Sequence, residues 1–120
     1  MDLIKIDSIN KELENLEERS EILGTAIVNR NGLLITSRLP RDIDVRKFSA
    51  MAATMFGAIN TIALSLKNKI YNISVDLEKY RVIILDINDY LLVSLLDLNV
   101  NLGLVLIEIE ETIKNLKKIC

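Results

Sequence analysis

The chain has 120 residues, half of them apolar and 27% charged, with a formal net charge of −2 at pH 7. That length and balance predict one folded domain over residues 1–120, and the interleaved charges give no extended positive field for binding nucleic acid. With no histidine and one cysteine, the sequence lacks zinc clusters and Ser–His or Cys–His nucleophile pairs, so we predict no catalytic residues, no metal site and no cofactor.

The first predicted element is an amphipathic helix over about residues 3–19. Its apolar residues recur at spacings of three and four, with charged residues between them, as in a helix with one buried side. These apolar residues are Ile6, Ile9, Leu13 and Leu16. The segment lacks the apolar run of a secretory signal, and we therefore expect a cytoplasmic protein.

A β-hairpin and a second helix follow. Residues 25–29 and 33–37 are predicted strands that flank Asn31-Gly32, the strongest short hairpin signal because both residue types tolerate a positive φ. Pro40 ends the second strand, and Asp44 is the predicted N-cap of a helix over about residues 45–66. Residues 48–66 have no charge, but polar and small side chains interrupt their apolar content, so we predict no membrane span.

Three strands and a last helix complete the chain. Residues 72–77 alternate apolar and polar side chains, which is typical of a half-buried edge strand. Residues 82–85 and 91–93 are continuous apolar runs joined through Asn88-Asp89, which predicts central strands covered on both faces. The last helix, over about residues 102–119, has one apolar stripe: Leu102, Leu106, Ile109, Ile113 and Leu116.

This order of elements predicts an α/β (α+β) fold with a five-stranded antiparallel sheet between helical layers. Counted along the chain, the predicted strand order is 2-1-5-4-3, because the fourth and fifth strands need burial on both faces and the third tolerates a wet side. The third strand is then an open edge of the sheet. Its residues are Asn72, Ile73, Ser74, Val75 and Asp76.

The second predicted helix has two sides without charges. One is a stripe of large apolar residues, which we predict to pack on the sheet: Phe48, Met51, Met55, Ile59, Ile62 and Leu66. The other side has small or neutral residues where a solvent-facing helix normally shows lysine and glutamate, and small residues let two helices approach closely. We predict an interface there, with Arg46 at its rim and these members: Ala50, Ala53, Gly57, Asn60, Thr61 and Leu64. The alternative is burial of this side within the same chain.

Several short motifs occur together along the chain. They are Ala26-Ile27-Val28 with the Asn31-Gly32 turn and Ile35-Thr36-Ser37, the run Ala50-Met51-Ala52-Ala53, and Asn101-Leu102-Gly103-Leu104-Val105. With these motifs the chain resembles the roadblock domain, the module of the dynein roadblock light chains and their prokaryotic relatives, over nearly its whole length. The resemblance implies a profilin-like fold in a prokaryotic member of the family.

The same resemblance implies a homodimer, or a heterodimer with a paralogue. In it the third strands pair edge to edge into a ten-stranded sheet, with the two second helices side by side. In relatives this platform, or a surface near it, docks Ras-like small GTPases as a regulator or scaffold, and no catalytic triad or metal site is known. We therefore expect a dimeric module that binds and regulates or scaffolds such a GTPase and is not an enzyme.

A small-molecule-sensing domain is the alternative function, because a sheet with helices also describes many sensors. The few aromatic residues and the absence of convergent polar pocket residues favour the interaction module. The scattered glycines form no phosphate-binding loop, and four aspartates are predicted to act in turns and caps: Asp42, Asp44, Asp86 and Asp89. Basic residues cluster near the hairpin, either as solvated surface or as contacts for an acidic partner: Arg30, Arg38, Arg41, Arg46 and Lys47.

Overall fold

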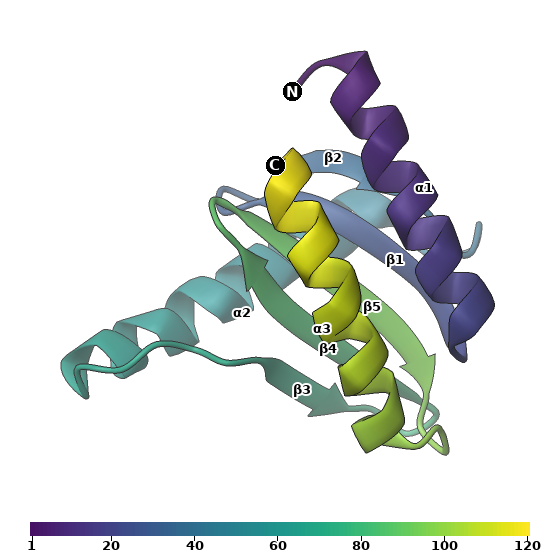
Figure 1. Ribbon diagram of the computed structural model, residues 1–120. Coiled ribbons are helices and arrows are strands. Elements are labelled where there is room, and N and C mark those ends of the chain that lie inside the picture. The colour runs from purple at the N-terminus through teal and green to yellow at the C-terminus, as the bar shows by residue number, and fades with distance from the viewer.

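The computed structural model describes residues 1–120 and contains three helices and one five-stranded sheet (Figure 1). The elements in chain order are α1 (Leu3–Arg19), β1 (Ile22–Asn29), β2 (Leu34–Ser37), α2 (Val45–Ser65), β3 (Ile73–Asp76), β4 (Tyr80–Ile87), β5 (Tyr90–Asp97) and α3 (Leu102–Ile119). The strands are antiparallel in the order β2-β1-β5-β4-β3. The predicted fold class and strand order are confirmed.

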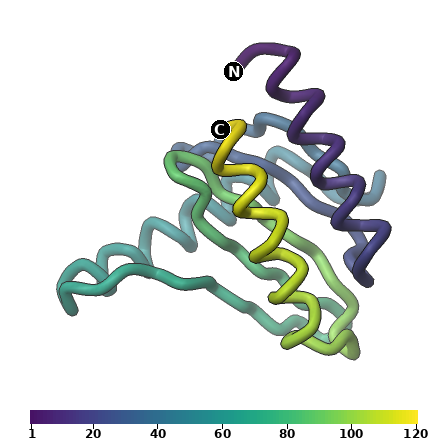
Figure 2. The backbone as a smooth tube through the Cα atoms, in the orientation of Figure 1, coloured from purple at the N-terminus to yellow at the C-terminus, as the bar shows by residue number.

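The helices form unequal layers on the two faces of the sheet. Helices α1 and α3 lie side by side on one face, and α2 lies on the other (Figure 1). The core under α1 and α3 contains 14 buried residues, whereas the core under α2 contains nine. Figure 2 shows that the second half of α2 extends past the edge of the sheet, and the last buried residue of α2 is Phe56.

Each helix is preceded by an N-cap residue, whose side chain accepts a hydrogen bond from the backbone N–H of the residue three positions later. Asp2 accepts from Lys5, Asp44 from Lys47, and Asn101 from Leu104. Such caps satisfy one of the N–H groups that have no partner within the helix. The predicted N-cap of α2 at Asp44 is confirmed.

The hairpin between β1 and β2 is closed by a turn in which only Gly32 has a positive φ, of 88°. The side chain of Asn29 accepts hydrogen bonds from the backbone N–H groups of Asn31 and Leu33. The turn predicted at Asn31-Gly32 is present, but Asn31 does not take the positive φ that the dipeptide signal suggests.

Strand β1 begins at Ile22, three residues before the predicted start at residue 25, and it includes Gly24. A Cβ atom at Gly24 would lie 2.7 Å from the backbone oxygen of Arg38, so this close approach of two backbones requires glycine. Glycine carries no strand signal, which explains the late predicted start. Strands β4 and β5 likewise run past their predicted apolar cores, to eight residues each.

By length and composition, α2 is the one helix that is long and apolar enough to cross a membrane. Part of this apolar character is used inside the fold, because Ala52, Ala53 and Phe56 of α2 are buried against the sheet. The helix therefore has a packed side, and its exposed apolar side chains belong to the surface described next.

Candidate functional site

Helix α2 contacts the sheet through a different side from the predicted one. Its buried side chains are those of Ser49, Ala52, Ala53 and Phe56. Phe48 and Met55 of the predicted sheet-facing stripe are half-buried, but the other members are exposed: Met51, Ile59, Ile62 and Leu66. The prediction that this stripe packs on the sheet is wrong.

The physical reason for this rotation is the hairpin turn. A Cβ atom at Gly32 would lie 3.1 Å from the Cα atom of Ala50 and 3.6 Å from the Cβ atom of Ala53. The turn therefore lies directly against α2, and only small side chains fit at such a close crossing. Three of the large apolar residues lie to one side of this contact and line a groove with Val75 of β3: Phe48, Met51 and Met55.

The predicted small-residue interface is only partly on the surface. Ala53 is 8% exposed and belongs to the core of its own chain, so its placement on the outer side is wrong. Ala50, Gly57, Thr61 and Leu64 are exposed, and Asn60 is half-buried. A Cβ atom at Gly57 would have no neighbour within 4 Å, so this chain alone does not require a glycine there.

Four exposed apolar side chains of α2 and the half-buried Met55 lie on one side of the helix, and we call this band the α2 stripe: Met51, Met55, Ile59, Ile62 and Leu66. Beside it, an apolar groove of about 170 Å³ lies between α2 and the edge strand β3. All seven residues that line the groove are apolar: Phe48, Met51, Ala52, Met55, Val75, Leu77 and Val82. A contiguous exposed apolar surface of this kind is typical of an interaction site.

The strand next to the groove is an open edge of the sheet. The backbone N–H of Leu77 donates to the carbonyl of Tyr80 on β4 at 2.7 Å. Because alternate residues of a strand point their N–H and C=O groups to opposite edges, those of Ser74 and Asp76 point away from β4 into the open. We call the α2 stripe, the groove and this edge the α2–β3 surface.

An ion pair lies at the same edge. Nε of Arg81 is 2.5 Å from Oδ1 of Asp76, across the β3–β4 pair. The hydrogen bond from the Arg81 guanidinium lowers the pKa of the Asp76 carboxyl, so this carboxylate stays charged well into the acid range. The open edge therefore carries a fixed ion pair beside its free backbone groups.

The outer side of α2 is also smooth and uncharged. The hydroxyls of Thr54 and Thr61 donate to the helix's own carbonyls, at Ala50 and Gly57, over 2.8 and 3.1 Å. Thr54, Gly57 and Thr61 are exposed on this side. Such a surface allows close approach of a flat partner without desolvating charges.

Arg46 lies away from the rest of the predicted interface. It lines a cleft of about 600 Å³ with Gly32, Leu33 and Leu34 of the hairpin. Leu64 is 18 residues further along the same helix, a separation of roughly 27 Å at 1.5 Å per residue. The structure therefore does not bring Arg46 together with Leu64, and one small contact cannot include both.

Four of the basic and acidic candidates form contacts within the chain. Arg30 donates to Asp86 at 2.6 Å and lies 5.0 Å from the ring centre of Phe56, and Arg38 pairs with Glu17 at 3.0 Å. Asp44 acts as a helix cap, as predicted. The remaining candidates are exposed and form no ion pair within the chain: Arg41, Asp42, Arg46, Lys47 and Asp89.

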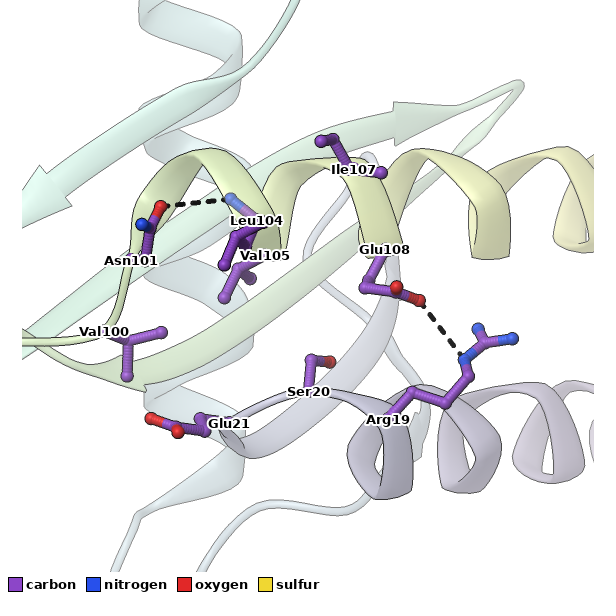
Figure 3. Close-up of a pocket in the computed structure, with 9 residues that line it drawn as sticks. All are labelled: Arg19, Ser20, Glu21, Val100, Asn101, Leu104, Val105, Ile107 and Glu108. Carbon is purple, nitrogen blue, oxygen red and sulfur yellow. Dashed lines mark hydrogen bonds and ion pairs between the residues drawn. The ribbon is translucent and has the colours of Figure 1, made fainter.

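A second exposed surface lies where α1 ends and α3 begins. Figure 3 shows this cleft, of about 300 Å³, with the ion pair between Arg19 and Glu108 at 3.4 Å along one side. Leu104 and Ile107 are exposed beside it. Neither residue was predicted to form a surface site. Both fall outside the apolar stripe that packs α3 on the sheet, and that mismatch is the signal in the sequence that identifies them.

Known proteins resemble the chain in sequence and in fold. The family profile of the Roadblock/LC7 domain matches residues 9–96. An uncharacterized protein of Methanocaldococcus jannaschii is 30% identical over 110 residues, which cover 91% of this chain and 96% of that protein. The structure of Myxococcus xanthus MglB superposes with a TM-score of 0.87 at 24% identity, covering 92% of this chain and 93% of that one.

A matched chain of the LokiProfilin1/rabbit actin complex gives a TM-score of 0.66 at 17% identity, covering 95% of this chain and 97% of that one. The two structural matches show a shared profilin-like fold.

Proposed function

The chain belongs to the Roadblock/LC7 domain family, and from that premise we propose that it is a dimeric module that binds a Ras-like small GTPase and regulates or scaffolds it. The family and the fold support a protein-interaction module. The observation that carries the proposal is the α2–β3 surface, in which an apolar stripe and groove adjoin a strand edge with free backbone groups. We further propose that residues 1–120 form one roadblock domain, without a catalytic site or cofactor.

In the proposed dimer, two β3 strands pair antiparallel across a two-fold axis. The outward backbone groups of Ser74 and Asp76 then gain partners, and the α2 stripes of the two copies meet over the joined sheets. An axis at Asp76 would place two carboxylates opposite each other, which is unfavourable. An axis at Ser74 or Val75 separates them, so the register lies there. A paralogue with a similar edge would fit in the same way.

Burial of the α2 stripe in the dimer also bears on where in the cell the protein works. Apolar side chains that a second copy covers are no longer available to lipid. We therefore propose that the protein works in the cytoplasm and that α2 does not span a membrane. Fractionation of cells by salt and detergent tests this, because a spanning helix would stay with the membrane pellet after a salt wash.

The GTPase is proposed to bind the uncharged outer sides of the paired α2 helices. Gly57, Thr61 and Leu64 are exposed there, and Arg46 is a charged contact at the far rim. Affinity capture followed by binding of the purified GTPase in its GTP and GDP forms tests the proposal. Binding in at least one nucleotide state is expected, and absence of binding in both states would contradict this part of the function.

Changing Arg46 to alanine should leave most of the stimulation of GTP hydrolysis intact. The chain offers no general base, so we expect it to act by shifting the conformation of the GTPase's own loops. Loss of an arginine finger would reduce hydrolysis by about 10³- to 10⁵-fold. Single-turnover hydrolysis distinguishes these outcomes, with Arg41→Ala as the control, because Arg41 is also exposed and unpaired. A loss of that size with binding preserved would establish a finger instead.

A further inference from the structure

A cleft of about 560 Å³ lies on the α3 side of the sheet, between the end of β4, the segment before β3 and α3. It forms because the ladder between β3 and β4 ends at the pair Ile73 and Ile84. Continuing that register would place Tyr71 opposite Asp86, but residue 71 is outside the strand. Tyr71 and Asp86 both line the cleft.

The backbone groups on both sides of the cleft lack partners. On β4, Tyr80 points its carbonyl to Leu77, and Asp86 lies an even number of residues away, so its N–H and C=O point to the same edge. No strand pairs with Asp86 there. On the opposite side, Ile70 and Tyr71 make no backbone hydrogen bond within the chain. Unpaired strand edges of this kind pair readily with an added extended segment.

The charges around the cleft are predominantly positive. Lys69, Lys114 and Lys117 line it, and none of the three forms an ion pair. The carboxylate of Asp86 is bound by Arg30, which leaves Glu110 as the one acidic side chain of the cleft without a basic partner. The chain as a whole is acidic, so this local excess of lysine is a distinct feature.

The wall of the cleft under these charges is apolar. Leu85 and Ile113 are buried, and Ile70 is half-buried. An occupant therefore meets apolar surface, free backbone groups and three ammonium groups together. A small rigid anion would use the ammonium groups alone, whereas an extended peptide with alternating acidic and apolar residues uses all three features.

We propose that this cleft binds an extended acidic segment of a partner protein, which pairs through its backbone with Asp86 and places carboxylates against Lys69, Lys114 and Lys117. The site is separate from the α2 face, so a GTPase bound to α2 does not compete for it. It gives the module a second docking surface, for a linear motif.

A short fluorescent peptide of alternating glutamate and valine tests the proposal on the full chain. It should bind in a salt-sensitive manner, the amide of Asp86 should exchange more slowly when it is bound, and the counterpart with lysine for glutamate should not bind. Lys114→Glu with Lys117→Glu should weaken binding by about tenfold or more. The matched control is Lys11→Glu with Lys118→Glu, which removes the same charge from exposed residues outside the cleft and should change binding by less than about twofold.

Three results would overturn the proposal. One is equal binding of the lysine peptide, another is an equal loss in the control variant, and the third is an Asp86 amide that does not respond. Binding of free ATP with the same dependence on lysine, without binding of the peptide, would show a small-anion site instead. None of these results bears on dimerisation or on the GTPase, which are measured separately.

Discussion

Ile62→Glu should convert the dimer into a folded monomer. Ile62 belongs to the α2 stripe and is 57% exposed in the single chain, so the substitution leaves the core unchanged. In the proposed dimer the same side chain is covered by the second copy, and an unpaired carboxylate buried there costs several kcal/mol. A loss of about 3–5 kcal/mol weakens association by roughly 10²- to 10³-fold or more. Sedimentation equilibrium measures the association, and circular dichroism checks the fold.

Ile107→Glu is the matched control for this variant. Ile107 is 62% exposed and lies on α3, on the opposite face of the sheet. The charge change and the starting exposure are nearly the same, but the site is outside the α2–β3 surface. The control should remain dimeric. If both variants dissociate, or if neither does, the assignment of the interface to the α2–β3 surface is wrong.

Ala53→Leu should destabilise the fold, whereas Gly57→Leu should not. Ala53 is packed against the hairpin turn at Gly32, and added methylenes in such a site cost about 1–3 kcal/mol. At Gly57 a new side chain has open space, and replacing glycine inside a helix is worth up to about 1 kcal/mol. The free energy of unfolding in urea should therefore fall for the first variant and stay equal or rise for the second.

Both substitutions are best measured in the Ile62→Glu chain, because the stability of a dimer includes its association. In the unmodified chain, Gly57→Leu should in addition weaken binding of the GTPase, since a bulky side chain there hinders close approach of a partner to the outer side of α2. Equal destabilisation by the two leucines in the monomer would show that Gly57 is packed like Ala53, and the orientation of α2 described above would then be incorrect.

The sequence predicted the elements and their order in the sheet because each carries a local signal. Alternation identifies the half-buried strand at 73–76, continuous apolar runs identify β4 and β5, and the helical period identifies all three helices. The antiparallel order follows from which strands need cover on both faces. The same reasoning predicted that β3 is an open edge of the sheet, and this edge is part of the α2–β3 surface.

The orientation of α2 was not predictable from its apolar pattern. A helix wheel assumes that the largest apolar residues face the core, but α2 has one side against its own sheet and another apolar side on the surface. The hairpin turn at Gly32 lies against Ala50 and Ala53, where a large side chain would not fit. The hairpin turn and α2 are separate segments of the sequence, so no pattern within either segment predicts their contact.

The lysine-lined cleft was missed for a similar reason. Lys69 and Lys114 are far apart in sequence and line one cleft because the segment before Ile73 does not pair with β4. In the sequence, each lysine is an ordinary charge on a solvated element. The end of a strand ladder is set by tertiary packing and has no signature in either strand alone.

The molar mass of the unmodified chain in solution tests the central claim most directly. The claim is that the α2–β3 surface is covered by a second copy. Light scattering coupled to size exclusion, at tens of micromolar chain, should give about 27 kDa, twice the chain mass of 13.6 kDa. A mass of 13.6 kDa under these conditions would contradict the account.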